Sequence, residues 1–83
     1  MSGAPGANSA VLRMCDAVDV LFTRHVGPIA EFLAEETREE WLKGGNKFNA
    51  THAFEYTELL SRHITDPAKR KRFVDDAMQH LKA

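Results

Sequence analysis

Four consecutive cations, Lys69-Arg70-Lys71-Arg72, are the sharpest concentration of charge in the sequence. They stand at the start of a segment expected to be helical, where the helix dipole is already positive and favours acids. Local helix stability therefore does not explain them. One interpretation is an anion contact, because basic residues at the start of a helix after a short turn are typical of a DNA-recognition helix. The other is a face that meets solvent or protein, which the balanced overall charge favours.

A second charged group lies upstream and is acidic. Residues 28 to 43 contain five glutamates and two cations, which gives a net charge of −3. Residues 67 to 82 have a net charge of +3. Complementary patches favour docking to a charged protein, or head-to-tail self-association, through rate and orientation. Alternatively, the two segments meet within the fold. The predicted partner-binding residues are Lys69, Arg70, Lys71 and Arg72 on one face and Glu35, Glu36, Glu39 and Glu40 on the other.

Trp41 follows directly after the acidic group. Aromatic side chains are enriched at the centres of protein interfaces, so Trp41 is a candidate anchor for the same contact. The alternative is that its ring closes the end of the hydrophobic core. Both placements stay open from the sequence.

The candidate metal ligands do not form a complete set. The sequence contains four histidines, His25, His52, His63 and His80. Only His80 has a carboxylate at the i, i+4 spacing that brings two ligands together on a helix, that of Asp76, and two ligands fall short of the three or four that a zinc site uses. We therefore expect solvated histidines and no metal site.

A catalytic set is also incomplete. Cys15 falls on an apolar stripe with no cation beside it, which indicates a small core residue rather than a nucleophile. Ser61 and His63 are too close in sequence to face one another on a helix, and no paired acid or glycine-rich turn accompanies them. We expect no enzyme activity and no cofactor.

Hydrophobic periodicity predicts four helices that position these groups, over about residues 9–26, 28–43, 51–64 and 67–82. The sequence also indicates where the helices end and begin. Gly27 and the pair Gly44-Gly45 are suited to the left-handed conformation that ends a helix. Asn49 or Thr51 is placed to cap the third helix, and Asp66, which precedes Pro67, is placed to cap the fourth.

The inward-facing positions follow from steps of three and four. In the first helix these are Val11, Cys15, Val18, Phe22 and Val26. In the second they are Ile29, Phe32, Leu33 and Thr37, with Leu42 or Trp41. In the third they are Ala53, Phe54, Leu59, Leu60 and Ile64, with Tyr56 and Thr57 at the margins. In the fourth they are Phe73, Val74, Ala77, Met78 and Leu81.

No segment shows the alternation of a half-buried strand, so the predicted fold is all-α, a compact bundle or an orthogonal array of four helices. With 83 residues there is room for one core, which we assign to residues 9–83. Residues 1–8 contain two glycines, one proline and no large apolar residue after Met1, and are expected to form a flexible tail.

The overall composition limits which classes of partner and which cellular compartment are expected. A net charge of −1 lacks the positive excess that drives general binding to nucleic acid or anionic membranes. A single cysteine cannot form an internal disulfide, and no apolar run has the length of a membrane span or the position of a signal peptide. We expect a cytoplasmic protein that does not enter the membrane.

Two stretches, His25-Val26-Gly27-Pro28-Ile29-Ala30 and the later LLSRHITDPAKRKRF, give the chain a resemblance to a known module. The chain is similar, from about Leu21 to Val74, to a small helical module of unassigned function at the C-terminal ends of bacterial signalling proteins, including serine/threonine kinases and response regulators. The resemblance implies a regulatory or interaction module and carries no catalytic residues. The chain itself has no kinase or receiver domain, so it is either part of a longer protein or a free-standing relative.

The loop after the second helix departs from that pattern, with Gly44, Gly45 and Phe48. A lone aromatic in a polar loop favours a plug over the core more than a binding residue.

The leading functional prediction is therefore a non-catalytic interaction module that binds a partner protein, or itself, through opposed acidic and basic helical faces. The alternative is a DNA-binding helix-turn-helix, in which residues 64–68 form the turn and the fourth helix enters the major groove.

Overall fold

Residues 9–45 and 49–82 are described by a computed structural model, and the secondary structure in this part of the chain is entirely helical. The four helices are α1 (Ser9–Val26), α2 (Ala30–Lys43), α3 (Ala50–Ser61) and α4 (Pro67–Lys82). The prediction of an all-α fold is confirmed. Helix α2 begins two residues later than predicted, and α3 begins one residue earlier and ends three residues earlier. The predicted flexible tail and the Phe48 plug lie outside the described residues.

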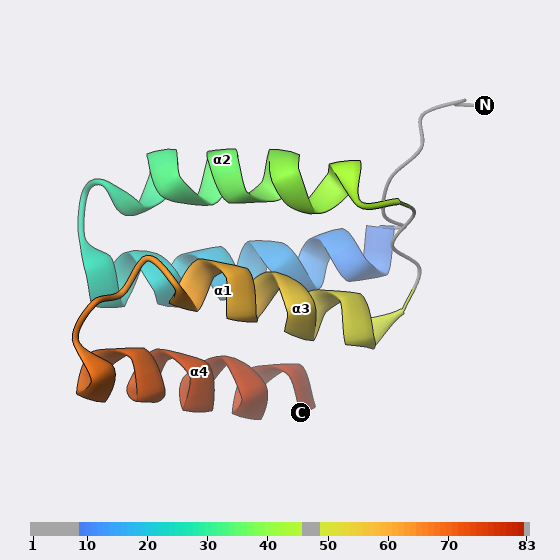
Figure 1. The fold of residues 1–83 in the computed structure, drawn as a ribbon. Helices are drawn as coiled ribbons and strands as arrows, with labels where there is room; N and C mark the ends of the chain where they lie inside the picture. Colours follow the sequence, from blue (N-terminus) through green and yellow to red (C-terminus); the bar gives the residue numbers. More distant parts are fainter. Residues whose placement is uncertain (1–8, 46–48, 83) are drawn as a thin grey trace.

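The helices alternate in direction along an up-down-up-down bundle, with α1 and α3 in the middle and α2 and α4 on opposite sides (Figure 1). Both outer helices pack on α1 and α3, and over the described ranges they do not contact each other. Short connections explain this order, because consecutive helices joined by a few residues become antiparallel neighbours. The bundle, rather than the orthogonal array, is the observed architecture.

Two glycines end helices as predicted. Gly27 has φ +94° and Gly45 has φ +117°, a conformation that L side chains rarely adopt. Gly27 lies in the turn from α1 to α2, and its backbone N–H donates to the carbonyl of Thr23 at 2.8 Å. Gly44, with φ −74°, remains right-handed, so the left-handed residue of the Gly-Gly pair is the second.

Side-chain caps begin the last two helices. The Oδ1 atom of Asn49 accepts from the backbone N–H of Thr51 at 3.0 Å, and Oδ1 of Asp66 accepts from that of Ala68 at 2.9 Å. Both caps satisfy N–H groups that have no partner within the helix. Of the two predicted caps for α3, Asn49 is therefore the one used.

The core lies between α1, α3 and the inner faces of the outer helices. Phe22 of α1 meets Phe73 of α4 edge to face, with ring centroids 5.4 Å apart. The fully buried side chains around them include Cys15, Val18, Tyr56 and Leu60. The predicted inner stripes of α1 and α4 are therefore correct at their central positions.

The prediction for α2 is wrong in part. Ile29 and Phe32, assigned to the core, are 57% and 60% exposed, and the helix buries Ala30 and Ala34 in their place. Thr37 is buried as predicted, and of the pair Leu42 and Trp41 it is Trp41 that is buried. Phe32 lies about 200° around the helix axis from Ala30, so both cannot face inward. Small alanines let α2 approach α1 and α3 closely, and the large ring of Trp41 fills the far end.

Tyr56 and Thr57 of α3 are also corrected, because both are fully buried rather than marginal. Each hydroxyl finds an acceptor that makes burial tolerable. The Thr57 hydroxyl donates to the carbonyl of Ala53 at 3.0 Å, and the Tyr56 hydroxyl donates to Asp19 at 2.5 Å.

Candidate functional site

Two grooves flank α2 and divide its glutamates between them. On a helix, residues four apart lie on one side, so Glu31, Glu35 and Glu39 form a line that we call the acidic row. The acidic row borders the groove between α1 and α2, whereas Glu36 and Glu40 border the groove between α2 and α3. Glu39 borders both grooves. All five glutamates are exposed as predicted, but they serve two surfaces rather than one.

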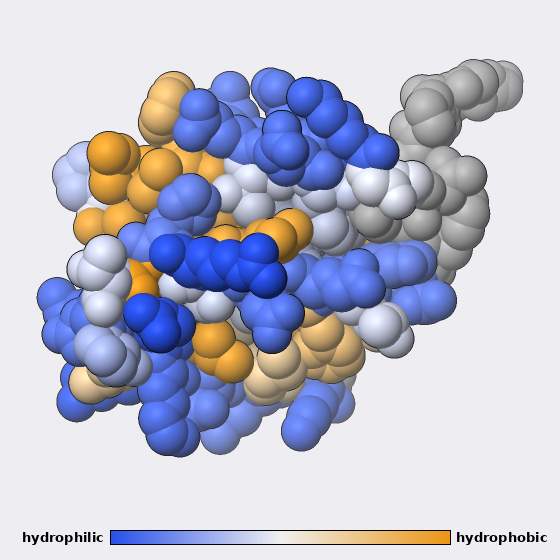
Figure 2. Space-filling model, viewed as in Figure 1, coloured by the Kyte–Doolittle hydropathy of each residue, from blue (hydrophilic) through white to orange (hydrophobic). Residues whose placement is uncertain are grey.

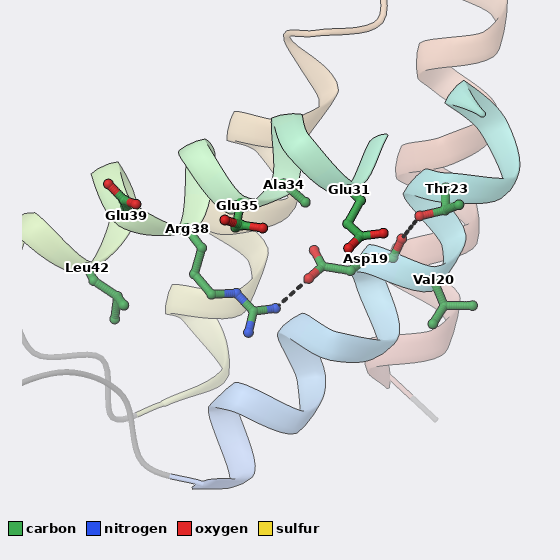
Figure 3. Close-up of a pocket in the computed structure, with 9 residues that line it drawn as sticks. All are labelled: Asp19, Val20, Thr23, Glu31, Ala34, Glu35, Arg38, Glu39 and Leu42. Carbon is green, nitrogen blue, oxygen red and sulfur yellow. Dashed lines mark hydrogen bonds and ion pairs between the residues drawn. The ribbon is translucent and has the colours of Figure 1, made fainter. Parts of the chain in front are cut away.

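The α1/α2 groove has a volume of about 430 Å³. Its wall on α1 is formed by Asp19, Val20 and Thr23, and its wall on α2 by the acidic row with Ala34, Arg38 and Leu42 (Figure 3). Val20 is 54% exposed and contributes apolar surface to the groove. The groove therefore combines apolar surface with a rim of carboxylates.

Arg38 is held by two carboxylates of α1. Its Nη1 donates to Oδ1 of Asp16 at 3.0 Å, and its Nη2 donates to Oδ2 of Asp19 at 2.6 Å. The guanidinium carbon also lies 5.3 Å from the centre of the Tyr56 ring, within range of a cation–π contact. This arrangement directs the cation of α2 towards α1.

Asp19 is the centre of this network. Besides Arg38, it accepts from the Tyr56 hydroxyl, which reaches Oδ1 at 2.5 Å. Burial raises the pKa of Asp19 above its ordinary value, although the hydrogen bond from Tyr56 and the charge of Arg38 act to lower it. Burial and the hydrogen bond to Asp19 also raise the pKa of Tyr56, which keeps the phenol protonated.

Charge in the α1/α2 groove remains strongly negative. The guanidinium of Arg38 already pairs with two carboxylates, those of Asp16 and Asp19, and has no charge left for the glutamates. The three side chains of the acidic row make no ion pair with any residue in the described ranges. The groove therefore presents unmatched carboxylates to whatever approaches it.

The α2/α3 groove, about 470 Å³, has mixed charge, because it is lined by Glu36 and Glu40 of α2 and by Arg62, which follows the end of α3. His63 Nε2 lies 2.9 Å from the hydroxyl of Thr37, and that hydroxyl lies 2.8 Å from the carbonyl of Leu33. The Thr37 hydroxyl has a single hydrogen, which it donates to the carbonyl of Leu33. In the contact between Thr37 and His63, Nε2 is therefore the donor and the hydroxyl oxygen the acceptor.

Exposed apolar side chains gather at the beginning of α2. Figure 2 shows hydrophobic surface over this end of the helix and hydrophilic surface along the rest of it. Ile29 and Phe32 are the large exposed members. The sequence predicts an inward position for both of them because they are large and apolar. The available signal was the spacing of Ala30, Ala34, Thr37 and Trp41, which puts the two alanines on one face with Thr37 and Trp41.

The predicted basic cluster, Lys69 to Arg72, is exposed at the start of α4, but its members have different roles. Arg70 folds back, and its Nε donates to the carbonyl of Ile64 at 3.0 Å, which ties α4 to the preceding turn. Lys71 pairs with Asp75 at 3.2 Å. The side chains of Lys69 and Arg72 form no ion pair or hydrogen bond with the residues that the structure describes.

The acidic and basic helices do not meet within the fold. Over the described ranges α2 has no contact with α4, because α1 and α3 stand between them (Figure 1). The alternative in which the two charged faces neutralise each other internally is therefore wrong. Their charges of −3 and +3 lie on opposite sides of the bundle.

Trp41 occupies the core position that was one of its two predicted placements. It is 3% exposed, and its indole Nε1 donates to the carbonyl of His52 at 2.9 Å. Its ring centroid is 5.2 Å from that of Tyr56. A buried ring cannot insert into a partner, so Trp41 supports the surface without forming it.

The histidines and Cys15 do not come together into one metal-binding or catalytic group within the described residues. His25 pairs with Asp76 at 3.1 Å, so the carboxylate that sequence spacing assigned to His80 reaches another helix instead. Within the described residues, no three side chains of His, Cys, Asp or Glu gather as metal ligands. Cys15 is fully buried, and burial raises the pKa of its thiol to about 12.

The α3–α4 pair bears on the DNA-binding alternative. In a helix-turn-helix the two helices cross at about 90–120°. Here α3 and α4 run antiparallel along each other (Figure 1). The basic cluster thus begins an outer helix of a bundle rather than a helix that projects across its predecessor.

Comparison with known proteins gives one family. Residues 16–83 match the family described as Domain of unknown function (DUF8082). Neither the curated proteins nor the solved structures contain a match to the chain. Among the described helices, none combines the length and hydropathy of a membrane span.

Proposed function

The chain belongs to this family of domains of unknown function, and from that premise we propose that it is a non-catalytic interaction module that binds a partner protein, or a second copy of itself, through acidic α2 and basic α4. The observation that carries the proposal is the separation of the two charged helices by α1 and α3. Opposite charges that do not meet inside the fold are both available to partners, where they accelerate and orient association.

The cellular setting of the proposal rests on the resemblance of the GPIA and DPA boundaries to modules of bacterial signalling proteins. Those boundaries are the left-handed turn at Gly27 and the cap at Asp66. We propose a cytoplasmic location, because the free and buried thiol of Cys15 suits a reducing compartment.

The test is capture of partners by the immobilised chain from a lysate of its own cells. One variant replaces the cations without a partner in the described fold, Lys69→Gln with Arg72→Gln, and leaves Arg70 to hold its turn. A second replaces Glu35, Glu36, Glu39 and Glu40 by Gln. A control, Arg13→Gln with Arg24→Gln, removes two exposed cations from α1, outside both charged faces.

We expect each test variant to lose a specific set of partners, identified by mass spectrometry, that the control retains. Sedimentation of the purified chain at low and high salt covers self-association, which the same variants are expected to weaken. Retention of every partner and of any self-association by both test variants would remove the charged faces from the function.

The exposed basic cluster keeps DNA binding as a second candidate. Anisotropy of labelled duplex DNA at about 50 mM and about 200 mM salt separates the two, because phosphate contacts are lost steeply over that range. Salt-sensitive binding abolished by Arg70→Glu with Arg72→Glu would support DNA binding. Absence of binding at the lower salt concentration would eliminate it.

A further inference from the structure

We infer that the α1/α2 groove is the docking site for a basic amphipathic α-helix of the partner protein. This inference deepens the proposed function and rests on it: it selects one side of α2 and states the chemistry of the occupant. Four features carry it, namely the spacing of the acidic row, the apolar surface beside it, the position of Arg38, and the contrast with the other charged surfaces.

The acidic row repeats with the period of a helix. Glu31, Glu35 and Glu39 recur every four residues, which at a rise of 1.5 Å per residue places these positions about 6 Å apart along the helix axis, over about 12 Å in total. A helix lying along α2 with Lys or Arg at every fourth position presents cations at the same spacing. A regular row thus matches a helical cation pattern better than it matches a single ion.

Apolar surface in the groove requires a partner with two faces. Val20 is 54% exposed on the α1 side, and Ala34 and Leu42 lie on the α2 side. A purely ionic partner would leave this surface wet, whereas aliphatic side chains of an amphipathic helix would cover it. The volume of about 430 Å³ lies in the range of clefts that hold ligand side chains.

Arg38 is held where it does not compete with an incoming cation. Its two hydrogen bonds to Asp16 and Asp19, and its place beside the Tyr56 ring, draw the guanidinium towards α1. Without these contacts the same side chain could reach along its own helix to Glu35, three residues earlier. The network therefore leaves the acidic row unpaired before a partner arrives.

The other charged surfaces fit this occupant less well. In the α2/α3 groove, Arg62 would repel a basic helix or pair with Glu36 and Glu40 itself. A second copy of the chain offers Lys69 and Arg72, but among the described residues α4 exposes no large apolar side chain to cover Val20. The groove thus favours a separate amphipathic helix over a second copy.

The probe is a fluorescent peptide of about 18 residues, long enough to form a helix, built from Leu and Lys with the leucines on one helical face. A scrambled peptide of the same composition is its control. Binding is measured by anisotropy against three proteins: the wild type, Glu31→Gln with Glu35→Gln, and the matched control Glu36→Gln with Glu40→Gln. Both pairs remove two charges from one helix, on different sides of it, and the control pair also releases Lys43 from its exposed ion pair with Glu40 at 3.5 Å.

We expect the Glu31/Glu35 variant to bind about tenfold more weakly and the matched control to bind within about twofold of the wild type. Val20→Ser is expected to weaken binding about threefold, through lost apolar contact alone. All five positions are exposed, and circular dichroism verifies that each variant remains helical.

Three results would overturn the inference: equal weakening by the two glutamate pairs, equal binding of the scrambled peptide, or no binding of the amphipathic peptide at low salt. Self-association that only the Glu31/Glu35 variant loses would assign the groove to a second copy instead. Failure here is distinguishable from failure of the proposed function, because partner capture through α4 or the α2/α3 groove would persist.

Discussion

Removing the hydroxyl of Tyr56 is expected to destabilise the fold by an amount that depends on pH. This hydroxyl is fully buried and donates to Oδ1 of Asp19 at 2.5 Å, while Arg38 donates to the other carboxylate oxygen. Tyr56→Phe keeps the ring against Trp41 and removes the donor. Asp19 is then left partly buried with one hydrogen bond fewer.

The size of the effect follows from the charge of the acceptor. A hydrogen bond to an ionised group contributes about 1.5–3 kcal/mol, compared with about 1 kcal/mol for a neutral pair. We expect a loss of about 2 kcal/mol at pH 7, which for a domain of this size lowers Tm by roughly 8–16 °C. The matched control, Thr57→Val, removes an equally buried hydroxyl that donates to a neutral carbonyl.

The sign of the pH dependence follows from the pKa of Asp19. Burial already raises this pKa in the folded protein, and the Tyr56 hydroxyl acts to lower it, so the variant raises the folded pKa further. A folded pKa above the unfolded value penalises ionisation, and the penalty is relieved as the pH falls through the folded pKa. The difference between wild type and variant should therefore be largest near neutrality and shrink towards pH about 4.

Urea denaturation of the three proteins at several pH values, monitored by circular dichroism, measures both quantities. Tyr56→Phe should lose stability mainly at neutral pH, whereas the loss for Thr57→Val should be nearly constant. A pH-independent loss for Tyr56→Phe, or a loss no larger than that of Thr57→Val, would refute a charge-assisted bond to Asp19.

Four further predictions concern single positions, and equilibrium unfolding measures the first three. Gly27→Ala should cost about 1 kcal/mol, because φ is +94° although no neighbour lies within 4 Å of the new Cβ; an unchanged midpoint would contradict the left-handed turn. Asp66→Ala should cost about 1 kcal/mol through loss of the α4 cap, and no loss would mean that the bond to Ala68 N–H contributes nothing. Phe32→Ser should change stability by no more than about 0.5 kcal/mol, since a core residue would lose several times more. Cys15 should react with iodoacetamide, followed by mass spectrometry, only after denaturation; rapid reaction of the native protein would contradict its burial.

The network around Asp19 connects stability to the proposed docking site. It holds a partly buried carboxylate and a partly buried guanidinium together, an arrangement that often contributes little net stability compared with apolar packing. Its effect on the surface is clearer, because it directs Arg38 towards α1 and leaves the acidic row without a cation. Variants of this network therefore affect the fold and the groove together.

Local sequence signals sufficed for the helices and their ends. Steps of three and four placed Val11, Cys15, Val18 and Phe22 on one face, and all four are buried. Gly27 and Asp66 marked boundaries because the left-handed turn and the side-chain cap depend on only a few neighbouring residues. The charges of α2 and α4 could likewise be counted directly.

Tertiary structure alone decided which faces turn inward and which charges meet. α2 carries two stripes, one of large apolar residues with Ile29 and Phe32 and one of smaller residues with Ala30 and Ala34, and only packing against α1 and α3 selects the second. The contact between Asp19 and Tyr56 joins residues 37 apart in sequence, so no local period reveals it. The sequence determines which residues share a face of each helix, because helical geometry is local. Which of these faces is buried and which stays exposed depends on the shape of the helices packed beside it.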